Sequence, residues 1–392
     1  MTALLASMSS VVVMAAVVAT AARGESDSAI EVEVATFGPH DFLPIAIGTR
    51  APLAIDDGVQ TEPVFDTEVS LRVERWGSML VSLTPWTDGH TPELPNSQRP
   101  AGIVRVAMAV PGPASGAGTS RELERCWFAW YEPKGETRGT AVLLPGMFGT
   151  PRWILETWTE QLTADGWLVV RMVTQPSRFT ERRRFDVDDG IEPVAQQVAD
   201  VFDARLIACA VSVAEACDTV EGKRPDLAEL PRIAIGLSGG GLMLPTVVAH
   251  DAERYNAAVV LAGGADLVSI IAESNYAPFI GAVSIRRGDR KLLEWELREL
   301  SEAYLATASA DPYHAATRMG SVETLIVQGT RDRAVPASSS DLLWTRMGEP
   351  DRWLWPAGHE VLALALQSRF GEVLDWIDEA VEGDDPDGRP QR

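Results

Sequence analysis

A single serine stands among glycines in the stretch RIAIGLSGGGLM, residues 232–243. The apolar run 233–235 ends abruptly at Gly236, and Ser238 follows two residues later. Glycines on both sides of a residue let a strand and a helix meet closely around a strained backbone. A serine on such a sharp turn presents its hydroxyl as a candidate nucleophile. The alternative is a glycine-rich turn without chemistry.

The segment GLSGG, residues 236–240, satisfies the pattern G-x-S-x-G, follows an apolar run and precedes a helical segment. The pattern alone is weak, and the strand–turn–helix setting gives it weight. With this setting the chain resembles the α/β-hydrolase fold family over roughly residues 122–380. The resemblance implies a nucleophile elbow at Ser238, with the next backbone amide aimed at the same place as the hydroxyl.

A serine hydroxyl is a weak nucleophile at its own pKa and needs a base. The chain has five histidines, and His359 lies in WLWPAGHEVLAL, between the last predicted strand and the last helix. The family takes its histidine from this loop, so the resemblance implies His359 as the base; the alternative is a surface histidine. The others are His40 and His90 in the N-terminal part, His250 near the end of the helix that follows the serine, and His314 in ASADPYHAA.

The base needs an acid that orients its ring and stabilises the imidazolium. Asp332 follows a predicted strand in LIVQGTRDRAVP, which is similar to the family's G-x-x-D-x-x-V-P segment. The resemblance implies the chain order Ser238, Asp332, His359. Asp266, after the preceding strand in LAGGAD, is the alternative acid, because some family members take the acid from there. Asp311 is a weaker alternative, since an Asp-Pro pair more often forms a turn or cap.

Acyl transfer also requires donors for the charge that develops on the carbonyl oxygen. The amide of Gly239, next to the serine, is one candidate. The resemblance places the second in the loop after GTAVLLPG, where Met147 is favoured and Phe148 comes next. The family often has His-Gly in this loop, and this chain has Pro145 and Gly146. Because the donors are backbone amides, an oxyanion site can form without the histidine side chain. The departure therefore affects the assignment to a subfamily and not the expected chemistry.

These loops need a scaffold, and the chain after residue 120 predicts one. Continuous apolar runs alternate with helical segments there, which is typical of a parallel sheet covered on both faces. We therefore expect an α/β fold with a mostly parallel central sheet over residues 121–380. Strands are expected at 125–131, 139–146, 167–171, 233–235, 257–261, 324–328 and 353–355, and helices at 152–165, 191–219 and from the serine to about 253.

Two regions depart from the alternation. Residues 267–320 predict a helical insertion before the strand that carries the acid, and Tyr276, Phe279 and Ile280 suit a lid over the site. A plain pair of packing helices is the alternative. Residues 25–120 predict a β-rich N-terminal extension, either a small domain or extra antiparallel strands.

Two groups of basic residues stand out, RFTERRRFD at 178–186 and IRRGDRK at 285–291. The first suits an anionic substrate group. The favoured interpretation of both is a solvated loop, with the first paired to Asp186, Asp188 and Asp189.

Composition limits the class of protein. The 392 residues carry a net charge of −22, which argues against a nucleic-acid partner, because phosphate binding needs clustered Lys and Arg. The acidic tail 381–392 predicts a disordered segment. Cys126, Cys209 and Cys217 form no C-x-x-C pair and show no zinc-ligand spacing, so we expect buried free thiols and no metal.

The N-terminus is uncharged from residue 4 to 22 and holds the small-x-small site Ala19-Thr20-Ala21. It resembles a secretory signal peptide over 1–22, which implies a periplasmic or secreted protein. The segment before the apolar run has no Lys or Arg, in contrast to most signal peptides. The alternatives to a signal peptide are an uncleaved membrane anchor and a buried segment. In those cases the protein would be membrane-anchored or cytoplasmic, with membrane contact only through this segment.

Together the residues predict a serine hydrolase that cleaves a carboxylic ester, or an amide, of a small or lipid-like molecule without a cofactor. A peptidase or acyltransferase would use the same three residues. A non-catalytic binding module with the same fold is the hypothesis from a different class, because fold alone does not determine function.

Overall fold

The computed structural model describes residues 32–37, 77–78, 92–93, 100–109 and 123–383, except 148–149, 151, 177–178, 180 and 277–282. The predicted signal peptide, the end of the acidic tail and the candidate residues Phe148, Phe279 and Ile280 lie outside these ranges. Among the described residues, no helix is both long and apolar enough to cross a bilayer.

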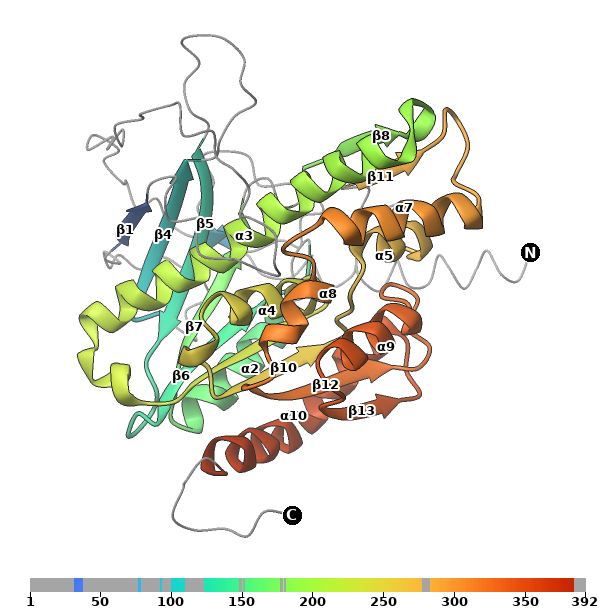
Figure 1. Ribbon diagram of the computed structural model, residues 1–392. Helices are drawn as coiled ribbons and strands as arrows, with labels where there is room; N and C mark the ends of the chain where they lie inside the picture. The colour runs from blue at the N-terminus through green and yellow to red at the C-terminus, as the bar shows by residue number, and fades with distance from the viewer. Residues whose placement is uncertain are drawn as a thin grey trace.

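In the described part of the chain, nine strands form one sheet in the order β1-β4-β5-β7-β6-β9-β10-β12-β13 (Figure 1). β5 runs antiparallel to both its neighbours, and the other pairs are parallel. The mostly parallel sheet of the sequence prediction is confirmed. The strands are β1 (Val32–Phe37), β4 (Gly102–Ala109), β5 (Leu123–Tyr131), β6 (Gly139–Leu144), β7 (Trp167–Thr174), β9 (Arg232–Leu237), β10 (Ala257–Leu261), β12 (Glu323–Gly329) and β13 (Asp351–Trp355).

Short strands form two further pairs, and helices connect the sheet strands. The pairs are β2 (Gly77–Ser78) with β3 (Pro92–Glu93), and β8 (Arg183–Asp186) with β11 (Val283–Arg286). The α-helices are α2 (Arg152–Ala164), α3 (Ile191–Lys223), α4 (Gly239–His250), α5 (Leu267–Glu273), α7 (Glu294–Thr307), α8 (Pro312–Ala315), α9 (Ala337–Arg346) and α10 (His359–Glu382). The 3₁₀ turns are Val187–Asp189, Pro225–Glu229, Ala252–Arg254 and Ala316–Arg318.

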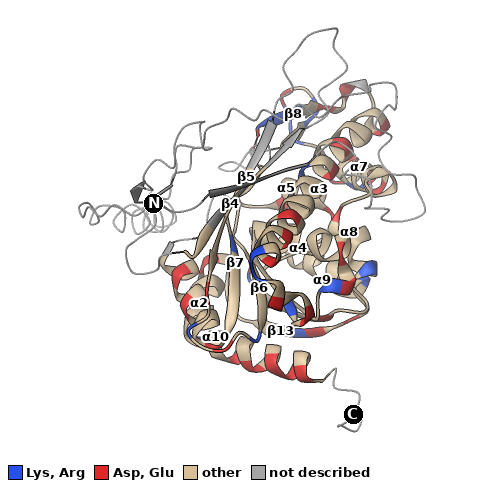
Figure 2. Ribbon diagram, turned by 90° about the vertical axis from the view of Figure 1, so that its left-hand side faces the viewer, with Lys and Arg blue, Asp and Glu red and all other residues tan. Residues whose placement is uncertain are grey.

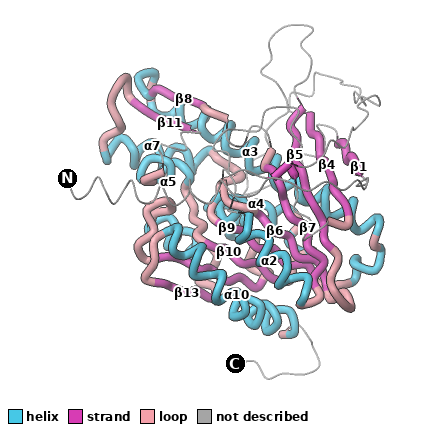
Figure 3. Tube along the Cα trace, turned by 180° about the vertical axis from the view of Figure 1, so that it is seen from behind, coloured by secondary structure: helices cyan, strands magenta, loops and turns pink. Residues whose placement is uncertain are grey.

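Helices cover both faces of the sheet, which explains why its central strands are apolar throughout. Every residue of β6, β9 and β10 is buried. Ile233 and Ile235 face the core that contains α2 and α10, while Ala234 faces the core that contains α3 and α4. Figure 3 shows α2 and α10 together on one face. Trp158 and Phe370 join these two helices, with stacked rings 5.0 Å apart.

The N-terminal extension contributes to the same sheet. β4 pairs antiparallel with β5 from Gly102↔Trp130 to Ala109↔Leu123, and β1 pairs parallel with β4. The described part therefore takes the form of extra strands, and the sheet begins before residue 121. Residues 67–74, whose alternating polar and apolar side chains are typical of a strand, lie outside the described residues.

The insertion at 267–320 is not purely helical, because it contains β11. β11 pairs in parallel with β8, which belongs to the first basic segment and was expected to be a loop. Figure 2 shows basic residues beside β8, in contrast to the acidic residues along α10. Asp186 accepts the Gly288 amide at 3.0 Å, and this bond, the Asp188 amide and, to a smaller extent, the charge of Arg184 lower the pKa of Asp186. Arg183 pairs with Glu181 at 3.2 Å.

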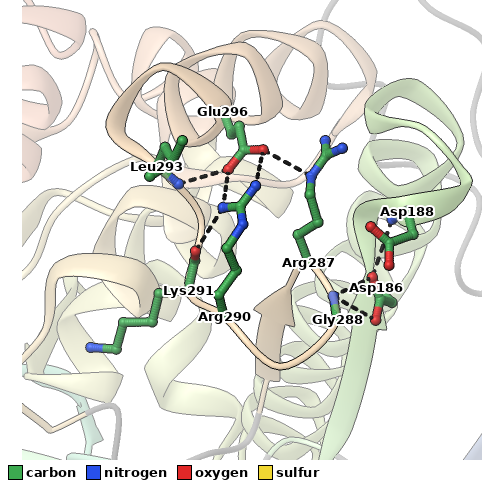
Figure 4. A network of polar contacts seen from close by, with 8 residues as sticks. All are labelled: Asp186, Asp188, Arg287, Gly288, Arg290, Lys291, Leu293 and Glu296. Carbon is green, nitrogen blue, oxygen red and sulfur yellow. Dashed lines mark hydrogen bonds and ion pairs between the residues drawn. The ribbon is translucent and has the colours of Figure 1, made fainter.

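A buried carboxylate organises the second basic segment (Figure 4). Glu296, at the start of α7, is 1 % exposed and accepts hydrogen bonds from the Arg290 guanidinium at 2.6 and 2.7 Å. Arg287 pairs with the same carboxylate at 2.8 Å. The Arg290 hydrogen bond, with the amide of Leu293, lowers the pKa of Glu296 to about 2. Two of the basic residues, Arg287 and Arg290, therefore hold the turn that follows β11 onto α7.

A second buried carboxylate joins the insertion to α3. Asp203 is 3 % exposed and accepts hydrogen bonds from the Ser309 amide and hydroxyl, each at 2.7 Å, and from the Ala310 amide at 2.8 Å. Burial raises the pKa of Asp203 to about 6, against the opposing effect of these hydrogen bonds.

This carboxyl predicts a loss of stability with rising pH. Its pKa is about 6 in the folded state and about 4 in the unfolded state. The stabilising contribution is therefore fully present below pH 4 and is lost as the pH rises through about 6. The difference between the two pKa values corresponds to on the order of 3 kcal/mol of unfolding free energy. Asp203→Asn should flatten this part of the pH profile of the urea unfolding free energy.

Asp200→Asn is the matched control, because Asp200 is exposed on the same helix. Its profile between pH 4 and 7 should follow that of the wild type. Identical profiles for Asp203→Asn and the wild type would contradict the prediction.

Candidate active site

Ser238 lies on the turn between β9 and α4 in a strained backbone conformation. Its φ of 54° and ψ of −114° are rare for a residue with a side chain, and such strain costs about 1–3 kcal/mol. The turn is held on both sides of the serine. The Ser238 amide donates to the Leu261 carbonyl at 2.8 Å, and its carbonyl accepts from the Leu242 amide at 2.8 Å.

The neighbouring glycines are required by close packing around the turn. A Cβ at Gly236 would lie 2.4 Å from the Gly240 carbonyl oxygen, and a Cβ at Gly240 would lie 2.2 Å from that of Leu144. A Cβ at Gly239 would lie 2.3 Å from the Met147 nitrogen. The pattern G-x-S-x-G is thus explained by contacts that exclude side chains on either side of the serine.

His359 is the first residue of α10 and faces Ser238. Its Nε2 lies 2.8 Å from the Ser238 Oγ, although the two residues are 121 positions apart. The loop that carries His359 is tied to the loop after β12: the amides of Thr330 and Arg331 donate to the carbonyls of Trp355 and Ala357, at 2.7 and 3.0 Å.

Asp332, in the loop after β12, binds the other nitrogen of the ring. Its Oδ2 lies 2.7 Å from His359 Nδ1, and its side chain is fully buried. Oδ1 accepts the amides of Ala334 at 2.8 Å and Val335 at 2.9 Å, which fixes the carboxylate in place. A carboxylate at Nδ1 favours the tautomer with its proton there and leaves Nε2 to accept the serine hydroxyl. The structure therefore brings together the three residues in the expected order.

The two alternative acids have other partners. Asp266 caps α5, and its Oδ2 lies 2.5 Å from the hydroxyls of both Ser269 and Ser301. Asp311 is fully buried and accepts the amides of Asp266 and Leu267, both at 3.0 Å, and burial raises its pKa. Both side chains hold the insertion in place, and the described contacts of His359 with an acid are with Asp332.

The candidate oxyanion donors lie side by side. A Cβ added to Gly239 would lie only 2.3 Å from the Met147 nitrogen, so these two backbone segments are in contact. The Met147 loop is fastened by two side chains. Thr150 Oγ1 accepts the Gly146 amide at 2.8 Å, and Gln175 Nε2 donates to the Gly146 carbonyl at 3.0 Å. The sequence carries no pattern that singles out Thr150 or Gln175.

A largely apolar cavity opens beside Ser238. Tyr276 lies at this cavity and packs edge-on against the His359 ring, with centroids 5.6 Å apart. Its hydroxyl is hydrogen-bonded to Glu360, and burial, followed by this bond, raises its pKa. Other residues around the cavity are Phe179, Phe202, Leu206, Leu242, Ile270 and Val283. The insertion thus contributes Ile270, Tyr276 and Val283 to the wall, while the choice between a lid and a pair of packing helices stays a prediction.

The remaining candidate groups lie apart from this constellation. His314 Nε2 is bonded to the Leu305 carbonyl at 2.7 Å, and burial lowers the pKa of His250. Cys126, Cys209 and Cys217 are buried and not joined in disulfides, as expected. Within the described ranges, no three His, Cys, Asp or Glu side chains form a group that could hold a metal ion.

These features define the α/β-hydrolase fold. They are the strand order with its antiparallel β5, the serine elbow after β9, and the later loops that carry Asp332 and His359. The predicted fold is confirmed.

No protein-family model and no curated protein matches the chain. Among solved structures, it is similar to the acylaminoacyl peptidase of Pyrococcus horikoshii, at 12% identity and a TM-score of 0.46, over 68% of this chain and 41% of that one. It is also similar to Est1E of Butyrivibrio proteoclasticus, at 15% identity and a TM-score of 0.42, over 64% of this chain and 96% of that one. The esterase PF2001 of Pyrococcus furiosus matches at 15% identity and a TM-score of 0.41, over 64% of this chain and 86% of that one. This chain spans less than half of the peptidase's length.

The packing at the elbow predicts opposite effects for two glycine substitutions. Gly240→Ala should destabilise the protein by about 2–3 kcal/mol, because its Cβ would collide with the Leu144 carbonyl. Gly222→Ala should stabilise it by about 0.5–1 kcal/mol, because Gly222 is exposed in α3 with no atom within 4 Å of the added methyl. Urea unfolding of both variants measures the difference. A Gly240→Ala variant as stable as the wild type would refute the close approach.

Proposed function

We propose that the protein is a serine hydrolase that cleaves a carboxylic ester through an acyl-enzyme. The observation that carries this proposal is the continuous hydrogen-bonded line from Ser238 Oγ to His359 Nε2, at 2.8 Å, and from His359 Nδ1 to Asp332 Oδ2, at 2.7 Å. These distances are those expected of a nucleophile, a general base and an orienting acid. The binding-module hypothesis would be favoured by Ser238 and His359 lying out of hydrogen-bond reach of each other, or by a folded protein without an activated serine.

The arrangement supports a two-step reaction. Ser238 Oγ attacks the ester carbonyl while His359 Nε2 takes the hydroxyl proton, and Asp332 stabilises the imidazolium that forms. The amides of Gly239 and Met147 bind the developing oxyanion. His359 then gives its proton to the leaving alcohol. Water, activated by His359 in the same way, cleaves the acyl-enzyme and releases the acid.

The surroundings of Ser238 favour an ester with an apolar acyl part. The cavity beside the serine is mostly lined by aliphatic and aromatic side chains, which suit a small or lipid-like molecule. Amide cleavage and acyl transfer use the same machinery and stay open alternatives. The steps above need no metal or organic cofactor. Export, and membrane contact through residues 1–22, stay predictions, since those residues lie outside the described ranges.

Labelling with a fluorophosphonate probe tests for an activated serine. The wild type should be labelled, Ser238→Ala should lose the label, and His359→Ala should lose most of it, because the hydroxyl then lacks its base. Ser368→Ala is the control, since Ser368 is exposed on α10. Labelled Ser238→Ala would place the nucleophile elsewhere. Folded wild-type protein that is not labelled would overturn the proposed function.

Comparing two aspartate variants tests the choice of acid. Asp332→Asn should lower kcat for a 4-nitrophenyl ester by roughly 10³- to 10⁴-fold, because an amide donor facing Nδ1 favours the wrong tautomer. Asp266→Asn should lower kcat by less than about 10-fold, because its carboxylate contacts Ser269 and Ser301. Thermal unfolding of both variants controls for folding. Equal losses of kcat in two folded variants would contradict the assignment of Asp332.

A further inference from the structure

The histidine at the centre of the candidate site has an aromatic neighbour to which the proposed reaction assigns no role. Tyr276, three residues after the end of α5, packs edge-on against the His359 ring, with centroids 5.6 Å apart and planes inclined by 80°. Tyr276 also lines the cavity beside Ser238. One aromatic ring therefore contacts both the base and the space beside the nucleophile.

Hydrogen bonds tie this part of the insertion to the two loops that carry the acid and the base. The Tyr276 hydroxyl donates to the carboxylate of Glu360, which follows the base directly on α10. The amide of Asn275 donates to the carbonyl of Arg333 at 2.8 Å, one residue after the acid. Burial, followed by the bond to Glu360, raises the pKa of Tyr276, so the hydroxyl stays protonated and remains a donor at neutral pH.

The reaction requires His359 to keep its orientation while one of its hydrogen bonds changes. Nε2 first takes the proton of Ser238 and then gives it to the leaving alcohol, so its bond to the serine is broken in every cycle. The bond from Nδ1 to Asp332 remains, but a ring held at one atom can swing about that bond. A rigid ring packed against its side limits the swing. This matters because a displacement of about 1 Å at a reacting group can cost about 100-fold in rate.

We propose that Tyr276 is a positioning residue for His359. Its ring keeps the imidazole in line between Asp332 and Ser238, and its hydrogen bond to Glu360 keeps the ring in place. This rests on the proposed hydrolase function. A tyrosine that only forms part of the cavity wall would act differently, because an altered wall changes KM according to the acyl chain, whereas a displaced base lowers kcat for every ester alike.

Steady-state kinetics with 4-nitrophenyl acetate, butyrate and hexanoate distinguish these two roles. Tyr276→Ala should lower kcat by roughly 10- to 100-fold, by the same factor for all three esters and with little change in KM. The rate of fluorophosphonate labelling should fall by a similar factor, because that step also needs the base. Tyr276→Phe keeps the ring and should restore most of the rate, leaving a loss of about 2- to 5-fold for the missing hydrogen bond.

A double-mutant cycle tests the bond to Glu360. Glu360→Ala should lower kcat as much as Tyr276→Phe does, and the variant with both changes should lose no more than either single variant. Tyr313→Ala is the matched control, because Tyr313 packs edge-on against His314, with centroids 5.0 Å apart, and is not among the described residues that line the cavity. Its kcat should equal that of the wild type. Thermal unfolding of each variant controls for folding.

The outcomes separate the two proposals. An unchanged kcat in folded Tyr276→Ala, or a loss that lies in KM and varies with the acyl chain, overturns the positioning role and leaves the hydrolase function standing. Additive losses in the cycle overturn the part of Glu360. A folded wild type that neither cleaves the esters nor reacts with the probe overturns both proposals. If Tyr276→Ala does not fold, Tyr276→Phe and Glu360→Ala decide the question, since both should be slower than the wild type.

Discussion

The strained backbone at Ser238 is the constraint on which the site depends. A φ of 54° at a residue with a side chain persists only where the surrounding structure leaves no better arrangement. Here that structure is the centre of the sheet: β9 is buried along its whole length, and the serine amide is bonded to the end of β10. The strain persists because relaxing the turn would disrupt the packing of these buried central strands.

A series of hydrogen-bonded groups, each fixed by the next, leads to the serine hydroxyl. The backbone amides of Ala334 and Val335 hold the Asp332 carboxylate, which holds the His359 ring, which reaches Ser238. Each link is anchored in a loop that begins at the end of a sheet strand. Groups held in this way need little reorganisation when charge develops, which is the main advantage of a preorganised site.

Much of this arrangement is predictable from local patterns. Ser238 follows a buried strand within a glycine pattern, and Asp332 and His359 each follow a later strand, so their order along the chain indicates their convergence at one edge of the sheet. The apolar runs predict the central strands within a few residues. The choice between Asp332 and Asp266 is different, because both follow strands, and only the partners of each carboxylate separate them.

Other features depend on contacts between segments far apart in the chain. β11 pairs with β8 across about 100 residues, and neither run is apolar enough to indicate a strand. Gln175 and Arg205 carry no sequence pattern, because a glutamine in a loop and an arginine in a long helix are ordinary until the fold places one against Gly146 and the other in the cavity that Ser238 lines. Long-range pairing of this kind overrides local preference.

The long helix α3 links these remote segments. Asp203 holds the segment at Ser309, within the insertion, while Arg205 holds the Glu181 carbonyl in the region after β7. The two side chains point to opposite sides of one helix, and the two regions they hold contribute Tyr276 and Phe179 to the cavity wall. The shape of the cavity beside Ser238 therefore depends on polar contacts made by α3, while the position of Ser238 itself depends on the sheet. A change in α3 or the insertion can thus reshape the cavity without disturbing the hydrogen-bonded line from Asp332 to Ser238.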